Sequence, residues 1–570
     1  MRVAVESEED IRELLLDRED KKEGEEGVGV EEPHVVVLSK LYETVAGNLH
    51  EVGEEIRKVF GKNALGMVVK ELLEQCDVQA QKILARFVEE KRLDELIRAT
   101  RSGSANPQDL GILLGELVLI SQRTTAFFSF LKARCSVPKD VEDNDTTGKS
   151  TTAGIEEVDV AEVIATSKLS VWSDDLASKF VTLESYVIEK NCAKAISIDE
   201  WQSPTSLTST AIDDTFFVLQ KSIQRAEAYG GNLNVLSTLL RRANQCLTGH
   251  LLPHIRARLR EAQSAALTTS STVSTNLDPN KLLSSVTYFA EFAKANIPLP
   301  SDATLPSTTG TTQEHTPVVA KYDMYVSLNN ASVSAQYASR FERSIEERLR
   351  SSGKDLQSQP GIRDNLTAIG DTAKTLKQVA NGGLDRMITT LSTRIQDGFD
   401  RFAEKLSYVI EDNAYDVESG FSSFFTQNLE KQVLTEEIEV RVTEDLWDTM
   451  VRKIAERVAD MLEGKVFLGR GAVRFNALGG LKAEREVRQL TGWFAEKCRK
   501  AVVRDLFTRL TQCAMIAALE RLSEVHDVWD SGSGITWRLS AVEVKKVDSL
   551  RHEKPSLIAC FFCSYFEIDK

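Results

Sequence analysis

Apolar residues recur along most of this chain at helical spacing. One run places them near a period of 3.6 residues, as on one face of a helix: Leu110, Leu113, Leu114, Leu117 and Ile120. The same spacing extends from Val35 to about Pro298 and returns from Lys321 onward, while the alternation typical of strands is nearly absent. The pattern predicts an all-α protein. Because one-sided stripes need partner helices and the helices are long and unequal, we expect an elongated rod of stacked antiparallel helical bundles rather than a regular solenoid.

Two stripes in the second half of the chain predict long helices. The first stops where Gly464 can take the left-handed conformation of a helix C-terminal cap, and comprises Leu446, Met450, Ile454, Val458 and Met461. The second is apolar on one side and comprises Val487, Leu490, Phe494, Cys498, Val502, Leu506 and Leu510. Both stripes should pack against partner helices.

Breaks in the pattern divide the chain into segments. Residues 1–33 hold 13 acidic and five basic residues, a composition typical of a disordered tail. Two stretches rich in polar residues predict loops, and the one near residue 300, with its Pro and Thr, is the better domain boundary. The predicted segments are an acidic, disordered tail (1–34), a helical bundle region (35–300) with a disordered loop at about 138–156, a linker (301–320), a helical bundle (321–464), a C-terminal helical unit (465–551) and a divergent tail (552–570).

Composition excludes several classes of function. The 570 residues carry a formal net charge of −16, which disfavours a protein that binds nucleic acid along its surface. No uninterrupted apolar run approaches the roughly 20 residues that span a bilayer, so we expect at most a peripheral membrane role. The N-terminus begins acidic rather than with a secretory signal, and the eight cysteines lie mostly in helical patterns. We therefore expect a reducing, cytosolic location.

Candidate chemical motifs are incomplete. The segment Asp143–Thr151 has the second half of a phosphate-binding loop, but Asp143 stands where the first glycine belongs, and Gly154 stands where a calcium loop needs Glu. Cys560 and Cys563 form a single CxxC without further zinc ligands. His250 and His254 lack the Glu of a metalloprotease helix, and Gly249 and Pro253 should disturb that helix. We predict no catalytic residue, cofactor or metal.

Basic residues cluster at two places. The first cluster comprises Arg241, Arg242, Arg256, Arg258 and Arg260. The second comprises Arg470, Arg474, Lys497, Arg499, Lys500 and Arg504. Solvated helix faces explain most such clusters, and the alternative is a docking surface for acidic partners or anionic lipid head groups.

Seven collinear stretches carry a resemblance to a known family. They are Leu73–Ile83 (LEQCDVQAQKI), Leu183–Asp199 (LESYVIEKNCAKAISID), Ile212–Ala226 (IDDTFFVLQKSIQRA), Val326–Ser334 (VSLNNASVS), Phe475–Leu490 (FNALGGLKAEREVRQL), Phe507–Val525 (FTRLTQCAMIAALERLSEV) and Ile535–Arg551 (ITWRLSAVEVKKVDSLR). In these stretches the chain resembles the fourth subunit of the conserved oligomeric Golgi complex, one of the multisubunit tethering complexes.

The resemblance implies a function. It implies a non-enzymatic subunit, bound peripherally to the cytoplasmic face of Golgi membranes, that acts in retrograde intra-Golgi vesicle transport. Its implied partners are the other subunits of the complex, SNAREs and Rab GTPases, without nucleic acid and without a cofactor. The alternatives are a helical-rod adaptor of another, exocyst-like tethering complex, and an enzyme with an unrecognised site. A deep polar pocket lined by titratable groups would favour the enzyme.

Both ends depart from the family pattern. An unrelated acidic stretch stands where family members carry a long coiled-coil-forming segment ahead of Val35. The sequence after Arg551 replaces a basic, Leu-rich final turn. The expectation is a chain altered at both ends, which puts in question contacts that the family makes through its N-terminal segment, including those with SNARE regulators of the Sec1/Munc-like class.

Candidate structural or partner-binding residues lie in the C-terminal helical unit. Ser540 is a plausible N-cap of the final helix, just before Glu543, and a return loop of about a dozen residues can bring this helix against the one that carries Arg509. We predict that Arg509 and Glu543 form a partly buried ion pair. The stretches that resemble the family add Trp537 and Arg538, from ITWRL, and Asn476, Gly479 and Gly480, from FNALGGL.

Overall fold

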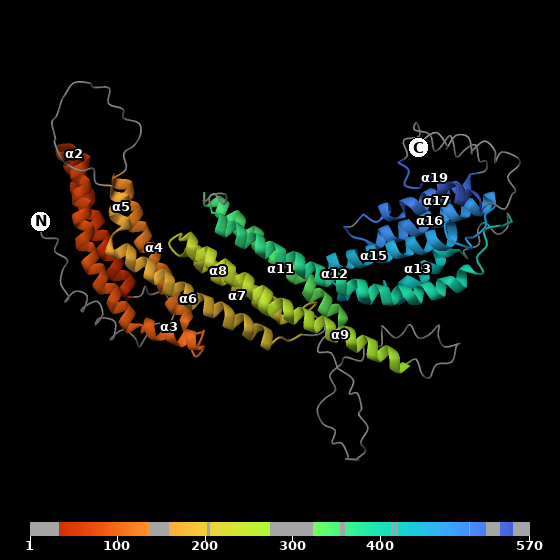
Figure 1. The fold of residues 1–570 in the computed structure, drawn as a ribbon, viewed down its shortest axis with the longest axis horizontal. Helices are drawn as coiled ribbons and strands as arrows, with labels where there is room; N and C mark the ends of the chain where they lie inside the picture. Colours follow the sequence, from red (N-terminus) through yellow and green to blue (C-terminus); the bar gives the residue numbers. More distant parts are fainter. Residues whose placement is uncertain are drawn as a thin grey trace, which may run out of the picture. The chain divides into compact units, whose positions relative to one another are not determined.

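The described part of the chain is helical. A computed structural model describes residues 33–135, 159–201, 206–273, 323–353, 359–411, 415, 420–500, 502–519 and 536–550 (Figure 1). Within these ranges there are α-helices and short π- and 3₁₀-helical turns, and the one β-type pairing is an isolated bridge between Tyr408 and Phe475. The prediction of an all-α protein is confirmed.

Helices occur in both halves of the chain. Those of the first half are α2 (Pro33–Glu90), α3 (Leu93–Ser102), α4 (Leu110–Cys135), α5 (Val160–Ala165), α6 (Lys168–Ser197), α7 (Thr210–Ala228), α8 (Leu233–Cys246) and α9 (Leu252–Val273). Those of the second half are α11 (Met324–Ser351), α12 (Pro360–Ala403), α13 (Phe421–Gln432), α14 (Glu436–Arg441), α15 (Glu444–Leu462), α16 (Ala477–Lys497), α17 (Thr508–Ala518) and α19 (Ala541–Asp548).

The chain forms two compact units that are not contiguous in sequence. Unit 1 comprises Met1–Glu200, Thr210–His254 and Gln336–Ala373. Unit 2 comprises Trp201–Ser209, Ile255–Ala335 and Lys374–Lys570. Each of α9, α11 and α12 therefore contributes residues to both units. The segments expected from the sequence, which divide the chain in order, stay predictions.

Helix α2 is a helical hairpin. The ring of His34 lies 5.6 Å from that of Phe87, and His34 Nε2 lies 3.2 Å from a carboxylate oxygen of Glu90. A straight helix would hold these ends about 80 Å apart. A Cβ on Gly53 would lie 3.6 Å from Leu65, so the reversal falls between these two residues. Figure 1 shows the two arms side by side.

Unit 1 is built around α4 and α6. Helix α4 packs against α2 and α6, and α6 packs against α7 and α8. Tyr42 of α2 stacks on Phe127 of α4 at 4.5 Å, and Phe180 of α6 stacks on Tyr229 at 4.4 Å. Helix α4 is long and apolar enough to cross a membrane, but 56% of its most apolar window is buried inside the protein, as in a core helix.

A π-helical turn joins α8 to α9. It spans Leu247–Leu251 and contains Gly249, and Pro253 follows it, so the prediction that these two residues disturb the helix is confirmed. The Nε2 atom of His254 lies 2.8 Å from Oδ2 of Asp199, and Oδ1 of Asp199 accepts the backbone N–H of Ala211. Through Asp199, His254 of α9 is therefore connected to the end of α6 and the start of α7.

Unit 2 centres on α15, α16 and α17. Helix α16 packs on α13 and α17, and α17 packs on α19. The first predicted stripe lines α15 and is largely buried against Trp447, Phe494 and Phe507. These aromatic side chains make one contiguous apolar core with the ends of α12 and α19.

Two local predictions are wrong. Gly464 is not left-handed: α15 continues into a π-helical turn, Glu463–Phe467, and the left-handed glycine in this region is Gly471. The second stripe does not form one helix, because α16 ends at Lys497 and Val502 is 61% exposed. The carboxylate of Asp448 accepts the backbone N–H groups of Arg499 and Lys500, which holds the chain out of helix there.

The N-terminal boundary of the helical region lies two residues earlier than the expected start at residue 35. Helix α2 begins at Pro33, inside the predicted tail 1–34, because proline suits the first turn of a helix and His34 packs on Phe87. Residues 1–32, the predicted loop at 138–156, the linker 301–320, and the tail 552–570 with Cys560 and Cys563 lie outside the described residues.

The hairpin can be tested by a distance measurement. Spin labels at Lys40 and Lys82, both exposed, should lie within about 25 Å of each other, because the arms run antiparallel. A straight helix would separate these positions by about 63 Å. Double electron–electron resonance distinguishes the two values, and a distance near the longer one would refute the hairpin.

Candidate functional site

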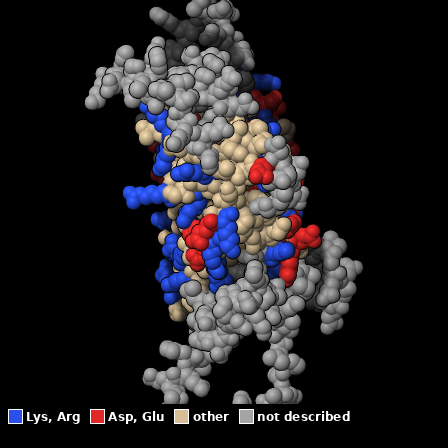
Figure 2. Space-filling view, turned by 90° about the vertical axis from the view of Figure 1, so that its right-hand side faces the viewer, with Lys and Arg blue, Asp and Glu red and all other residues tan. Residues whose placement is uncertain are grey.

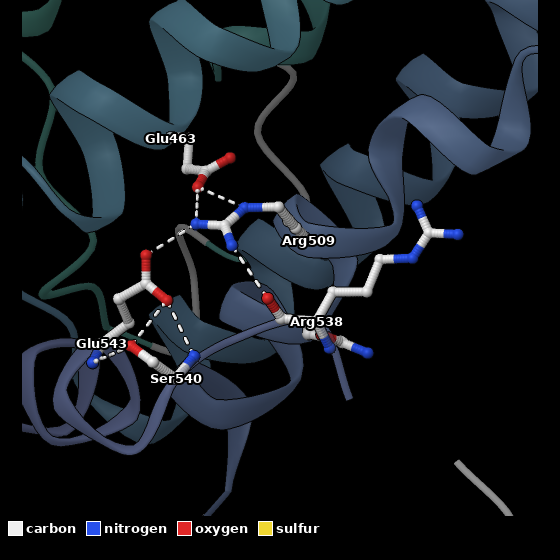
Figure 3. A network of polar contacts seen from close by, with 6 residues as sticks. Glu463, Arg509, Arg538, Ser540 and Glu543 are labelled. Carbon is white, nitrogen blue, oxygen red and sulfur yellow. Dashed lines mark hydrogen bonds and ion pairs between the residues drawn. The ribbon is translucent and has the colours of Figure 1, made fainter. Parts of the chain in front are cut away.

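Arg509 joins three segments of unit 2. It lies on α17, and its guanidinium donates to one carboxylate oxygen of Glu463 at 2.8 and 2.6 Å and to Glu543 at 2.7 Å (Figure 3). Its Nη1 donates to the carbonyl of Arg538 at 2.8 Å. The predicted ion pair between Arg509 and Glu543 is therefore present, and it is partly buried, with side chains 36% and 30% exposed.

Glu543 also closes the N-terminus of α19. Its Oε2 accepts from the backbone N–H of Ser540 at 2.7 Å, and the Ser540 hydroxyl accepts the backbone N–H of Glu543, which makes a capping box. The backbone of Ser540, followed by the Arg509 guanidinium, lowers the pKa of Glu543 from 4.5 to about 2. Glu463, followed by Glu543, raises the pKa of Arg509. These shifts keep Arg509 and Glu543 charged, and the hydrogen bonds among the three side chains suit a structural joint.

Trp537 and Arg538 lie in the segment that precedes α19. The backbone N–H of Arg538 donates to Oε1 of Gln512 at 2.9 Å, and Nε2 of Gln512 donates to the carbonyl of Thr536 at 3.0 Å. Trp537 packs half-buried against the core of unit 2. The side chain of Arg538 is exposed and points away from Glu463 and Glu543 in Figure 3. A role of either residue in partner binding stays a prediction.

Asn476 positions the start of α16. Its Oδ1 accepts the backbone N–H of Gly479 at 2.8 Å, as an N-cap does, and its Nδ2 donates to the carbonyl of Ile410 at 2.7 Å. Its own backbone N–H donates to the carbonyl of Tyr408 at 3.1 Å. The side chain of Asn476 thus caps the N-terminus of α16 and holds the segment after α12 against this helix.

Gly479 and Gly480 permit close approach of the backbone. A Cβ on Gly479 would lie 1.6 Å from the carbonyl oxygen of Tyr408, and a Cβ on Gly480 would lie 2.0 Å from that of Ala517. Both distances are far below any real carbon–oxygen contact, so α16 could not reach the Tyr408 segment or α17 with a larger residue at either place. Gly492, on the same helix, faces open space.

Sequence reasoning missed a buried carboxylate beside these glycines. The hydroxyl of Tyr408 donates to Oε2 of Glu486 at 2.6 Å, and both residues are buried. Burial raises the pKa of Glu486 and that of Tyr408. The signal available in the sequence was that Glu486 shares an apolar face with Ala483, Val487 and Leu490.

A second missed group surrounds Asn329 and Asn330 of α11. The amide of Asn329 donates to the carbonyls of Leu207 and Arg441 and accepts from the backbone N–H of Thr443. Asn330 accepts from the backbone N–H of Ser209 at 3.0 Å. These two side chains fasten two loops to one helix, and they occupy the centre of the VSLNNASVS stretch.

Three of the six residues in the basic cluster of the C-terminal part lie close to carboxylates. Arg499 pairs with Glu439 at 2.5 Å, and Lys500 pairs with Glu444 at 2.8 Å. Lys497 approaches Glu430 at 3.6 Å. Figure 2 shows the end of the molecule at the right of Figure 1, where Lys and Arg side chains gather along one side with Asp and Glu beside them. This cluster alone does not define an anion-binding surface.

No catalytic arrangement emerges from the described residues. Among them, no group of three or more His, Cys, Asp or Glu side chains could hold a metal ion. A small cavity in unit 1 is lined by apolar and hydroxyl side chains without a charged group: Leu84, Ile120, Ser121, Thr124, Leu169, Ser173, Leu176 and Tyr229. The polar contacts described above join helices to one another.

These features place the chain in the class of all-α helical-bundle proteins whose buried polar side chains connect helices. Residues 324–546 match a family model described as "Conserved oligomeric Golgi complex subunit 4, C-terminal", and residues 16–106 and 98–259 match "COG4 transport protein, middle alpha-helical bundle". The chain therefore belongs to the family of the conserved oligomeric Golgi complex subunit 4. Since the match begins at residue 16, the expectation of an unrelated stretch ahead of Val35 is wrong over residues 16–34.

Individual relatives agree with the family models. The chain is 25% identical to the conserved oligomeric Golgi complex subunit 4 of Arabidopsis thaliana over 553 residues, which cover 94% of the chain. It is 24% identical to that of Mus musculus and 25% to that of Homo sapiens, over 90% of the chain. The chain spans 66% of the length of the first relative and 64% of the other two, slightly under two thirds.

The contacts of Gly480 and Gly492 predict opposite changes in the free energy of unfolding when each glycine is replaced by alanine. Gly480→Ala should lower the free energy of unfolding by about 2 kcal/mol, because the added methyl group pushes α16 off α17. Gly492→Ala, the control on the same helix, should raise it by about 0.5 to 1 kcal/mol through helix propensity. Urea unfolding followed by circular dichroism measures both. Equal effects of the two substitutions would contradict the close packing.

A double-mutant cycle tests the Arg509 joint. Arg509→Ala should lower the free energy of unfolding by about 2 kcal/mol. The substitution removes the guanidinium that pairs with the carboxylate of Glu463, whose side chain is only 19% exposed. Glu543→Ala should cost about 1 to 2 kcal/mol through the ion pair and the capping box, with a coupling energy of about 1 kcal/mol to Arg509, given its partial exposure. Arg488→Ala breaks an exposed pair with Glu484 and should change little. Near-wild-type stability of both single variants would show that the joint is not structural.

Proposed function

We propose that this chain is a non-enzymatic subunit of the conserved oligomeric Golgi complex that helps to tether vesicles in retrograde intra-Golgi transport. The observation that carries the proposal is the family match, which extends through both halves of the chain. The chain would act peripherally on the cytoplasmic face of Golgi membranes. Its partners would be the other subunits of the complex, together with SNAREs and Rab GTPases, and it would need no cofactor.

The side-chain contacts support a mechanical role. Arg509, Asn476 and Asn329 each fasten two or more segments to one helix, and each lies in a stretch that resembles the family. Such joints fix the faces that the helices present to partners. Binding to partners requires only that these faces keep their shape, because preorganised surfaces lose less conformational entropy on association.

The alternatives differ in what they predict. An adaptor of another, exocyst-like tethering complex would share the helical architecture, but the family models and relatives name the Golgi complex. For an enzyme, no observation on the described residues supplies a nucleophile, a base and a substrate pocket in one place. We therefore place the chain in the Golgi complex.

Quantitative affinity purification tests the proposal. The full chain, tagged and expressed in its own cells, should enrich the other subunits of the Golgi complex, with SNAREs and Rab GTPases at lower levels. Gly480→Ala should reduce this enrichment and Gly492→Ala should not, if the joint between α16 and α17 supports assembly. Enrichment of exocyst subunits, or of nuclear or mitochondrial proteins without Golgi proteins, would reject the proposal.

A further inference from the structure

Apolar side chains are exposed where α2 reverses. Val59 and Phe60, which lie between Gly53 and Leu65, are 70% and 72% exposed. Met67, two residues past Leu65 on the second arm, is also exposed. Val59 and Phe60 therefore lie at the tip of the hairpin, and Met67 lies near it.

The charge at this tip is opposite to that of the chain. From Ile56 to Lys70 the sequence contains four basic residues and no acidic residue, although the whole chain carries −16. The nearest acidic residues are Glu55 and Glu71. Within the described part of the chain, no ion pair is found for Arg57 or Lys58, which directly precede the two apolar residues. In the sequence, basic residues thus lie on both sides of the exposed apolar residues Val59 and Phe60.

The end of α4 adds basic residues to the same end of unit 1. Arg134, in the last turn of α4, contacts Nδ1 of His50, about two turns below Val59 on the first arm of the hairpin. Lys132 lies on the same turn of α4 and is exposed. Because α2 and α4 pack together, the cations of both helices belong to one end of the unit.

We propose that the tip of α2 binds the surface of a lipid bilayer that contains anionic lipids. Phe60 and Val59 enter the interface between head groups and acyl chains, where aromatic and aliphatic side chains are favoured. Arg57, Lys58 and the basic residues behind them attract the anionic head groups. This inference goes beyond the proposed function, since it assigns to this chain a direct lipid contact that does not depend on its protein partners.

The chemistry favours a membrane over a protein partner. The exposed apolar patch consists of a few side chains at a tip, whereas a helix-binding groove needs apolar side chains repeated along a face. A tip whose stretch of sequence from Ile56 to Lys70 contains basic and no acidic residues suits a surface of uniform negative charge. Two or three apolar side chains with a few cations give weak, reversible binding, which is appropriate to a peripheral contact that adds to others.

Vesicle flotation of the purified full chain tests the proposal. The wild-type chain should float with vesicles of phosphatidylcholine and phosphatidylserine, bind phosphatidylcholine vesicles weakly, and dissociate as salt is raised. The double variant Val59→Ser/Phe60→Ser should bind the anionic vesicles about tenfold less. Lys58→Glu should weaken binding to anionic vesicles without changing the residual binding to neutral ones. Phe60→Trp should bind as the wild type does.

A matched control separates this tip from general hydrophobicity. Ile112 is 72% exposed, as Phe60 is, and lies at the other end of α4, near Asp109 and Glu116. Ile112→Ser should bind vesicles as the wild type does. All variants replace exposed residues, so their unfolding midpoints should match that of the wild type, and a thermal melt checks this.

Several results would overturn the proposal. Absence of wild-type binding to anionic vesicles, equal binding of the Val59→Ser/Phe60→Ser variant, or an equal loss in Ile112→Ser would each do so. If the wild type fails to bind vesicles and the double variant loses subunits of the Golgi complex in affinity purification, the tip is a protein contact. That outcome would leave the proposed function in place, because purification of the wild-type complex is scored separately.

Discussion

A protein made of long helices must satisfy the backbone groups at the helix ends, since four N–H and four C=O groups at each helix have no partner within it. In this chain, single polar side chains from distant helices do much of that work. Asp77 of α2 accepts the N–H groups of Lys168 and Leu169 at the start of α6. Asp448 of α15 accepts the N–H groups of Arg499 and Lys500, which directly follow the end of α16. These contacts decide which helix end meets which helix, whereas the apolar stripes decide only that helices pack.

The stretches that resemble the Golgi subunit family contain these joints. Asp77 lies in LEQCDVQAQKI, and the buried pair of Glu184 and Arg225 joins the next two stretches at 2.9 Å. Asn329 and Asn476 lie in two others, and Arg509 contacts Glu543 across the last two. The stretches that carry the resemblance therefore contain residues that connect helices.

The sequence predicted the helical fold and one joint, and physical reasons explain the rest. Helical periodicity is a local property, so the all-α class followed directly. The ion pair of Arg509 and Glu543 could be predicted from the sequence because a short return loop limits where the last helix can lie. Glu463 was missed because it is 46 residues from Arg509 along the chain and lies in a π-helical turn that periodicity does not reveal. The reversal within α2 was missed because both arms keep a helical pattern.

Gly464 and Glu486 show two further limits. A glycine after an apolar stripe favours a left-handed cap, but here the helix passes into a π-helical turn and the left-handed residue is Gly471. A glutamate in a helix favours solvent, but Glu486 is buried against Tyr408. For Glu486, a tertiary contact outweighed a local preference of about 1 kcal/mol.

Hydrogen exchange tests the central claim, that polar side chains of one helix hold the backbone of another. The amides of Arg499 and Lys500 lie outside α16 and α17, and their acceptor is the carboxylate of Asp448. In the wild-type chain they should exchange at least about a hundredfold more slowly than an unprotected peptide, and Asp448→Ala should remove that protection while the middle of α16 keeps its own. Exchange of these two amides at the unprotected rate in the wild type would contradict the account.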